Sequence, residues 1–189
     1  PDMGCPFQDR VKPVLIRWCE WGNRGTGAVG LLRTYRLRLA RKRWRFRAFR
    51  KRRELSAVAN RTAQIRPADI LVFSTLRNER VRLPYFLRYY RDIGVNHFLI
   101  VDNDSTDGSA EYLREQPDVS LWRSAYSYKR SRFGVDWLNW LQMRYGHGHW
   151  TLVVDPDEFF VYPFCDTRPL RALTDWLDAS SIRSFSAML

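Results

Sequence analysis

From Asp69 onward, short apolar runs alternate with stretches whose apolar residues recur at helical spacing. Four runs have the length and composition of buried strands: 70–76, 95–101, 119–122 and 149–154. Four stretches predict helices between and after them: 83–93, 110–115, 134–145 and 169–178. Because strands that alternate with helices are typical of an α/β fold, we expect a mostly parallel sheet flanked by helices.

Residues that start or stop helices support these limits. Pro84 is tolerated in the opening turn of the predicted helix 83–93, and Gly94 lies just past the end of that helix. Gly146 follows the helix 134–145, and Thr167 is positioned as an N-cap for the helix that opens at Pro169. The aromatic face of the helix 134–145, with Trp137, is predicted to pack in the core rather than to bind a cofactor.

The N-terminal part of the chain has a different pattern. Residues 1–30 mix Gly, Pro and Trp without a sustained period, so no element is assigned to them. Residues 31–58 are predicted to form a helix, with Tyr35, Leu39 and Phe46 near one face. We therefore divide the chain into a basic helical arm, 1–66, and an α/β domain, 67–189. The final residues, 185–189, have the pattern of an incomplete strand, which predicts a domain truncated at its C-terminus.

Positive charge is concentrated in the arm. The 189-residue chain has a formal net charge of +12, and residues 31–53 hold twelve Lys or Arg and no acid. The other 20 basic residues are matched by 20 acidic ones, so the domain itself is electrically balanced. We expect the arm to contact an anionic membrane or to remain a solvated basic helix. Nucleic acid binding, with Trp44 and Phe46 as stacking groups, ranks below both.

Cysteine content and hydropathy bear on the compartment. Cys5, Cys19 and Cys165 are odd in number and lack the spacing of metal ligands, which favours a reducing environment. The sequence contains neither a charged-then-apolar leader nor a run of roughly 20 apolar residues long enough to span a membrane. We therefore expect a cytoplasmic protein that contacts the inner face of the membrane only peripherally.

Polar loops follow three of the predicted strands. The first strand is followed by Arg77-Asn78-Glu79, the second by Asp102-Asn103, and the fourth by Asp155-Pro156-Asp157-Glu158. In open parallel sheets, ligands bind beyond the carboxyl ends of the strands, so these loops are candidates for one site. Asp102 and Asn103 can accept hydrogen bonds from a nucleoside, whereas the following Ser and Thr residues are typical of an ordinary turn.

The acidic loop is the candidate metal site. Three carboxylates at the tip of a buried strand cost free energy unless a cation compensates their charge. Oxygen ligands of this kind favour Mg²⁺ or Mn²⁺ over zinc. An Asp-x-Asp sequence is also common in simple turns, and Glu79 can equally pair with a neighbouring arginine. His147 and His149 are predicted to be solvated or satisfied rather than ligands.

Three segments together resemble the family 2 glycosyltransferases, which have the GT-A fold. These segments are TLRNER at 75–80, FLIVDNDSTDGS at 98–109 and WTLVVDPDEFF at 150–160. The resemblance covers about residues 67–165 and is strongest to bacterial members with an Arg-Asn-Glu sequence after the first strand. It implies an enzyme that transfers a sugar from a UDP-type nucleotide-sugar donor to a glycan or lipid-linked acceptor, as in polysaccharide biosynthesis.

The resemblance also implies roles for individual residues. Asp102 and Asn103 would hold the nucleoside with Glu79 beside it, and Arg77 and Asn78 belong to the same nucleotide-binding loop. Asp157 would coordinate Mn²⁺ or Mg²⁺, Asp155 would lie near the ribose or the metal, and Glu158 would support them. Arg132 lies where relatives often place a basic residue near the donor. The catalytic base of these inverting enzymes would be a carboxylate beyond Leu189, and Asn103 replaces an Asp found in many relatives.

One other enzyme class fits part of the pattern. A phosphatase of the haloacid-dehalogenase type also has Asp-x-Asp after an apolar strand, and would use Asp155 as nucleophile and Asp157 as acid. Glu158-Phe159 stands here where Gly-Thr is usual in that class, and few residues follow for the remaining catalytic parts. The glycosyltransferase is therefore the preferred prediction.

Overall fold

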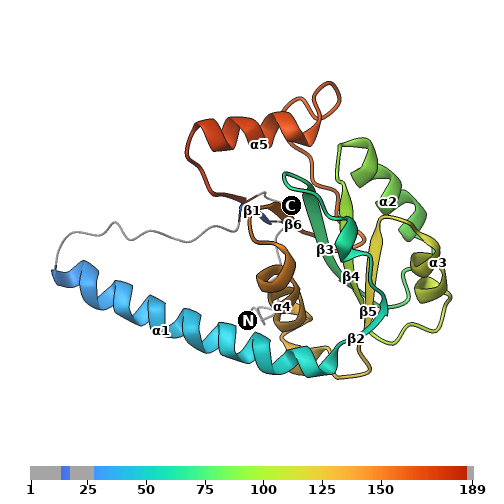
Figure 1. Ribbon diagram of the computed structural model, residues 1–189, viewed down its shortest axis with the longest axis horizontal. Coiled ribbons are helices and arrows are strands. Elements are labelled where there is room, and N and C mark those ends of the chain that lie inside the picture. Colours follow the sequence, from blue (N-terminus) through green and yellow to red (C-terminus); the bar gives the residue numbers. More distant parts are fainter. Residues whose placement is uncertain (1–13, 18–27, 187–189) are drawn as a thin grey trace, which may run out of the picture.

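The computed structural model describes residues 14–17 and 28–186, with side chains from residue 35 to residue 185 (Figure 1). Within these residues, seven strands form one sheet in the order β2-β5-β4-β3-β6-β1-β7. The strands are β1 (Val14–Arg17), β2 (Ser56–Ala59), β3 (Ile70–Leu76), β4 (His97–Asp102), β5 (Val119–Arg123), β6 (Trp150–Val153) and β7 (Ser184–Ser186).

The four central strands, β5, β4, β3 and β6, run parallel to one another. Strands β2, β1 and β7 extend the sheet at its two edges in antiparallel pairings. The register aligns Leu76 with Asp102 and Asp102 with Arg123, so the strands end level with one another. The predicted α/β fold with a mostly parallel central sheet is confirmed, and each predicted strand is present within two residues of its predicted limits.

Five α-helices are present in the described residues: α1 (Ala28–Lys51), α2 (Leu83–Asp92), α3 (Ser109–Glu115), α4 (Val135–Tyr145) and α5 (Leu170–Ala179). Alternate residues of β3 point to opposite faces of the sheet. Ile70 and Val72 pack with α2, α3 and α5, whereas Leu71 and Phe73 pack with α4. Helices therefore cover both faces, and the predicted core face of α4 is confirmed by the fully buried Trp137.

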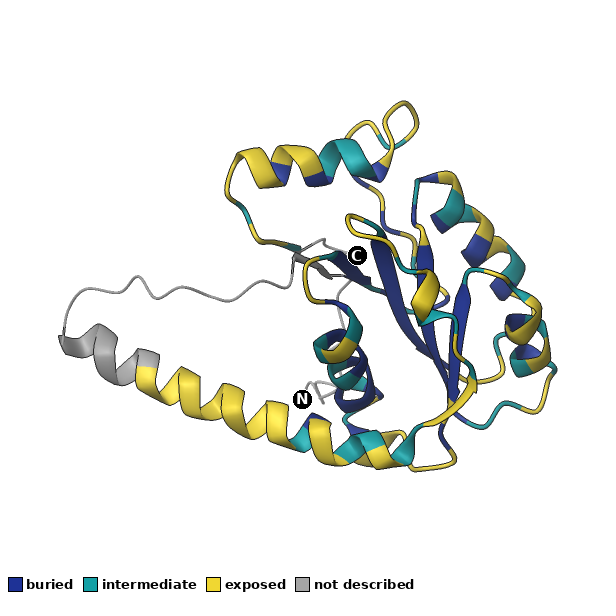
Figure 2. Ribbon diagram, viewed as in Figure 1, coloured by how far each residue is buried: buried dark blue, intermediate teal, exposed yellow. Residues whose placement is uncertain are grey.

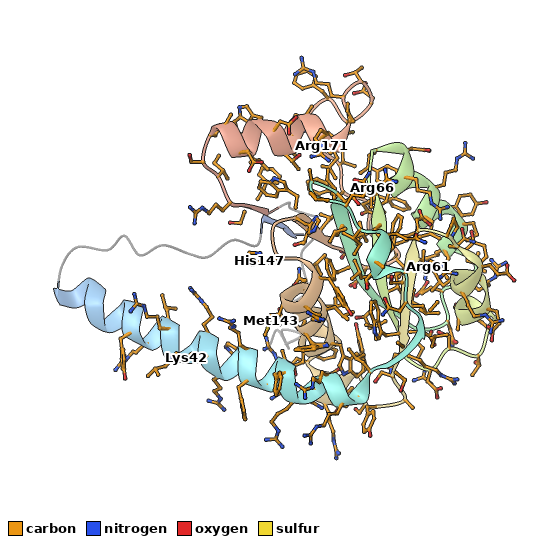
Figure 3. The ribbon with its side chains drawn as sticks, in the orientation of Figure 1. Lys42, Arg61, Arg66, Met143, His147 and Arg171 are labelled. Carbon is orange, nitrogen blue, oxygen red and sulfur yellow. The ribbon has the colours of Figure 1, made fainter. Side chains whose placement is uncertain are left out.

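The predicted helix 31–58 is correct only in part. The helix ends at Lys51, and after the short 3₁₀ turn η1 (Arg52–Glu54) the chain becomes extended at Leu55. Residues Ser56–Ala59 then form β2, because the edge of β5 offers backbone hydrogen bonds that this segment accepts. Arg61 fastens the segment further, since its guanidinium donates to the carbonyl oxygens of Val119 (3.0 Å) and Arg114 (2.8 Å) (Figure 3).

Residues 14–17, for which no element was predicted, form the strand β1 between β6 and β7. The N-terminal region 1–66 is thus helical only in part, and it contributes two strands to the sheet. The predicted C-terminal strand is present as β7, although residues 187–189 lie outside the described part of the chain. Of the cysteines, only Cys165 is described, and it is free and half-buried.

The predicted N-cap at Thr167 is wrong. The residue before α5 is Pro169, and Thr167 lies two residues upstream, where its hydroxyl donates to the carbonyl oxygen of Phe164 (3.4 Å). The opening of α5 is instead fixed by its backbone, because the Leu170 N–H donates to the carbonyl oxygen of Ile93 (2.8 Å). Helix α5 is thereby joined directly to the end of α2.

The C-terminal end of α1 packs on α4, whereas most of its length is exposed (Figure 2). Arg47 Nε donates to the buried carboxylate of Asp136 (2.6 Å), and Phe49 makes an edge contact with Trp140 (5.8 Å between ring centres). Glu54 accepts a hydrogen bond from the Trp137 indole N–H (2.9 Å). Among the described helices, none is long and apolar enough to cross a bilayer.

Candidate functional site

A cleft of about 300 Å³ lies at the carboxyl ends of β3, β4 and β6. From β3 the chain passes through β4 and β5 on one side, and β6 then pairs with the other side of β3. Such a reversal of strand order leaves a crevice beside the strand ends, which is where open α/β sheets bind their ligands. Nine residues line this cleft: Thr75, Leu76, Arg77, Glu79, Asn103, Tyr128, Asp155, Pro156 and Asp157.

Carboxylates form one wall of the cleft. The pKa of Asp155 is raised to about 6, first by burial and then by the negative charges of Glu158, Asp157 and Glu79. Asp157 is exposed on the same turn, which closes through a hydrogen bond from the Glu158 N–H to the Asp155 carbonyl oxygen (3.0 Å). Four acidic side chains therefore act electrostatically on one another at this point.

Helix α2 holds the acidic loop in place. The Tyr90 hydroxyl donates to the carbonyl oxygen of Glu158 (3.0 Å) and accepts the Phe160 N–H (3.1 Å). Tyr89 adds a hydrogen bond to the carbonyl oxygen of Phe160 (2.9 Å). Burial raises the pKa of both tyrosines, so they remain protonated donors at neutral pH. Glu158 itself is half-buried and lies outside the cleft lining.

Asn103 presents an amide oxygen that is available to a ligand. Its Nδ2 donates to the carbonyl oxygens of Ser124 (2.7 Å) and Tyr126 (2.9 Å), which uses both amide protons and fixes the orientation of the group. The Oδ1 atom is left as an acceptor on a residue that lines the cleft. An aspartate at this position would direct a carboxylate oxygen at two carbonyl oxygens, which explains why an amide suits this chain.

Asp102, which was predicted to contact the nucleoside with Asn103, lies beneath the cleft instead. It is the last residue of β4 and is fully buried, and its Oδ2 accepts the Ser105 N–H (3.2 Å). Its Oδ1 is buried without a hydrogen-bond partner. Because the Asp102 side chain is absent from the lining, its present position supports the loop rather than reaching the cleft.

Asn78 likewise ties two loops together. Its Oδ1 accepts the Thr106 N–H (2.9 Å), and its own N–H donates to the Ser105 hydroxyl (2.9 Å). The backbone at Asn78 is left-handed (φ 57°), a conformation that Asn tolerates better than most residues. Asn78 therefore joins the loops after β3 and β4, while its neighbours Arg77 and Glu79 line the cleft.

Arg77 is the cation among the lining residues, and it is exposed. Glu79 forms an ion pair with Arg82 (2.5 Å), which is the pairing with a neighbouring arginine that the sequence predicted as its alternative role. This pairing raises the pKa of the arginine. Arg132, predicted to lie near the donor, is directed elsewhere. Its guanidinium lies over the Trp44 ring of α1 (4.0 Å) and 3.7 Å from Asp136 Oδ1, which places it outside the lining of the cleft.

Tyr128 is a lining residue that the sequence did not indicate. It precedes η3 (Lys129–Ser131), packs edge-on against Phe133 (5.7 Å between ring centres), and faces the acidic wall. Burial raises the pKa of its phenol, and Asp155 and Asp157 raise it further. The segment has no strand or helix periodicity, and only its position in the fold brings the ring to the cleft.

The donor atoms of the acidic loop fit a hard divalent cation. No group of three His, Cys, Asp or Glu side chains that could hold a metal alone is present in the described part of the chain. Mg²⁺ and Mn²⁺ commonly use one or two carboxylates and take their other ligands from phosphate and water. Burial and the neighbouring carboxylates raise the pKa of Asp155, and a bound cation would favour its ionised form, so Asp155 and Asp157 suit this mode.

Comparisons with known proteins do not assign this cleft. No protein-family model matches the chain, and no curated protein is similar to it in sequence. The function must therefore be inferred from the residues that line the cleft and from their position at the strand ends.

The raised pKa of Asp155 predicts that this residue destabilises the free protein. With a pKa of about 6 in the fold and about 3.9 in the unfolded chain, the protonated form is favoured by folding. The contribution of Asp155 to the free energy of unfolding is therefore highest below about pH 4 and falls as the pH rises to about 6. Asp155→Asn should increase the free energy of unfolding by about 1–2 kcal/mol at neutral pH, with little difference near pH 4.

Urea unfolding between these pH values, in the presence of a chelator, measures this difference. Asp166→Asn is the matched control, because Asp166 is exposed and lies outside the cleft lining. A less stable Asp155→Asn protein at neutral pH would contradict the prediction.

Proposed function

We propose that this chain is the donor-binding part of a metal-dependent glycosyltransferase of the GT-A type, using a UDP-type nucleotide sugar. The observation that carries the proposal is the convergence of Asn103, Arg77 and the Asp155–Asp157 turn on one cleft. An acceptor amide, a cation and two carboxylates are the groups that a nucleoside, a diphosphate and its divalent ion require. The strand order β5-β4-β3-β6 is compatible with a nucleotide-binding α/β sheet.

Each residue has a defined task in this proposal. The Asn103 Oδ1 accepts an N–H of the base, and the Tyr128 ring forms an apolar wall beside it. Arg77 pairs with phosphate oxygens, and Asp155 and Asp157 hold the Mn²⁺ or Mg²⁺ ion. When bound, the ion neutralises the negative charge that builds up on the departing nucleoside diphosphate.

Sugar transfer also requires a base that takes the proton of the acceptor hydroxyl. The carboxylates of the cleft are assigned to the cation and to structural pairing, as for Glu79 with Arg82. We therefore assign no catalytic base among the lining residues, and the acceptor, glycan or lipid-linked, is a further part of the proposal.

Calorimetric titration of the chain with UDP tests the proposal. Binding is expected with Mn²⁺ or Mg²⁺ and is expected to disappear when a chelator removes the ion. Titrations with ADP and GDP examine the base preference that Asn103 would impose. Binding of UDP that is unchanged by the chelator would contradict the metal assignment. Hydrolysis of an aryl phosphate without UDP binding would favour the phosphatase that uses Asp155 as nucleophile.

A further inference from the structure

Helix α1 carries two apolar stripes on opposite sides. At about 100° per residue, Leu37, Trp44 and Ala48 lie within about 40° of one another around the helix axis. Tyr35, Leu39 and Phe46 form a second stripe of similar width, centred roughly 180° away from the first. A helix that packed on one neighbour alone would need only one of these stripes.

The first stripe faces the rest of the molecule and is covered in part, since Leu37 is 56% exposed and Trp44 40% exposed. Ala48 is fully buried, and Trp44 is covered on one side by the guanidinium of Arg132. Leu37 and Trp44 line a hollow shared with Asn139 and Met143 of α4. This side of α1 therefore faces α4 and the body of the domain.

The second stripe points away from the body and is left exposed. Tyr35 is 60% exposed, Leu39 48% and Phe46 63%, which is unusual for three large apolar residues aligned on one helix. Cations flank the stripe, including Arg38, Lys42 (Figure 3), Arg43 and Arg50, all of which are exposed. Within residues 35–51 the helix contains no acidic side chain.

We propose that α1 lies on an anionic lipid surface, with Tyr35, Leu39 and Phe46 inserted among the head groups. The flanking Arg and Lys side chains reach sideways to lipid phosphates while their methylene stems cover the edge of the stripe. The density of positive charge without any acid complements an anionic bilayer.

A lipid surface fits these features better than a nucleic acid. A duplex presents phosphates to basic side chains, but it offers no apolar layer for Leu39 and Phe46. The rest of the chain carries balanced charge, so the excess of positive charge belongs to the helix rather than to the domain. A bilayer provides both the charge and the apolar layer along the whole exposed side of the helix.

The surface is coupled to the domain through the other side of α1. Arg47 is held by the buried Asp136 (2.6 Å) and donates to the carbonyl oxygen of Arg130 (2.9 Å), so α1 is fastened to the segment that carries Tyr128. Docking of α1 would hold the cleft close to the membrane. This inference goes beyond the proposed function and does not depend on it.

Sedimentation with sucrose-loaded vesicles tests the inference. The protein is expected to bind vesicles that contain phosphatidylserine, to bind pure phosphatidylcholine weakly, and to be released by high salt. Replacing Tyr35, Leu39 and Phe46 together with Ser should weaken binding to anionic vesicles by roughly tenfold or more. Trp176→Ser on α5 is the control, since Trp176 is 57% exposed but lies outside α1.

A second variant tests the charge without changing the stripe. Arg38→Gln with Lys42→Gln should weaken anionic binding and leave the weak neutral binding unchanged. Circular dichroism checks that the helix is retained in both variants. Equal binding to neutral and anionic vesicles, or unchanged binding by the triple variant, would overturn the inference. Tighter binding to random duplex DNA than to anionic vesicles would overturn it in favour of a nucleic acid. Asp157→Asn should leave vesicle binding unchanged, which separates this test from that of the cleft.

Discussion

Asp157→Asn is expected to lower the affinity for UDP in the presence of Mn²⁺ by about 100-fold or more, without loss of stability. The proposed ion uses one or two protein carboxylates, so removing one of them removes a large share of the protein's hold on it. Asp157 is exposed and its side chain makes no hydrogen bond within the described residues, so the fold does not depend on it. A 100-fold loss corresponds to about 2.7 kcal/mol of binding free energy.

Calorimetry with UDP and Mn²⁺ measures the affinity, and thermal unfolding checks the fold. Asp166→Asn changes the same functional group at another exposed position and should bind like the parent chain. The effect should vanish when both proteins are compared in chelator, because neither then holds the ion. If Asp157→Asn bound UDP with the parent affinity in Mn²⁺, the assignment of Asp157 as a ligand would be wrong.

The central strands were predictable because their residues are buried on both faces. In β3 and β4, runs of four apolar residues (70–73 and 98–101) are followed by polar ones, so both the strands and the region where they end can be recognised in the sequence. The rule that ligands bind at strand ends then brings Arg77, Asn103 and Asp157 together without knowledge of the side-chain positions. The convergence of these three residues on one cleft agrees with that expectation.

The edge strand β2 was not predictable from local pattern. Ser56–Ala59 is short and mostly exposed, and it is extended because β5 lies beside it rather than because of its own composition.

The roles of individual loop residues were likewise not predictable from local sequence. Asn78 and Asn103 are alike in the sequence, yet the first joins two loops and the second lines the cleft. Such differences depend on contacts between residues more than 20 positions apart.

Tyr128 and Arg132 show how backbone conformation redirects side chains. Arg132, Phe133 and Gly134 are all left-handed, with φ of 54°, 57° and 78°. This succession turns the chain sharply before α4, so Tyr128 faces the cleft while Arg132 faces Trp44. Only the glycine is favoured in this conformation, and the two other residues are held there by the surrounding structure.

Gly134→Ala is expected to destabilise the protein by about 3 kcal/mol, lowering the melting temperature by roughly 6–12 °C. Part of the cost is the left-handed backbone at φ 78°, which a Cβ disfavours. The larger part is steric, because a Cβ at this position would lie 2.7 Å from Thr75 Oγ1 and 2.9 Å from Thr75 Cγ2. Thr75 is buried in β3 and paired with Val101, so it cannot move aside without disturbing the sheet.

Gly108→Ala separates the two contributions. Gly108 also precedes a helix and is left-handed at φ 84°, but a Cβ there would meet no atom within 4 Å, so only about 1 kcal/mol should be lost. Thr75→Ala removes the two atoms closest to the new Cβ, so it should recover at least about 1 kcal/mol when combined with Gly134→Ala in a double-mutant cycle. Equal losses for Gly134→Ala and Gly108→Ala, with additive behaviour in the cycle, would show that contact with Thr75 is not what requires glycine. Because Thr75 lines the cleft, its close approach to Gly134 also links the start of α4 to the candidate binding site. The affinity for UDP should therefore fall with Gly134→Ala. It should be unchanged by Gly148→Ala, because a Cβ at Gly148, as at Gly108, would meet no atom within 4 Å.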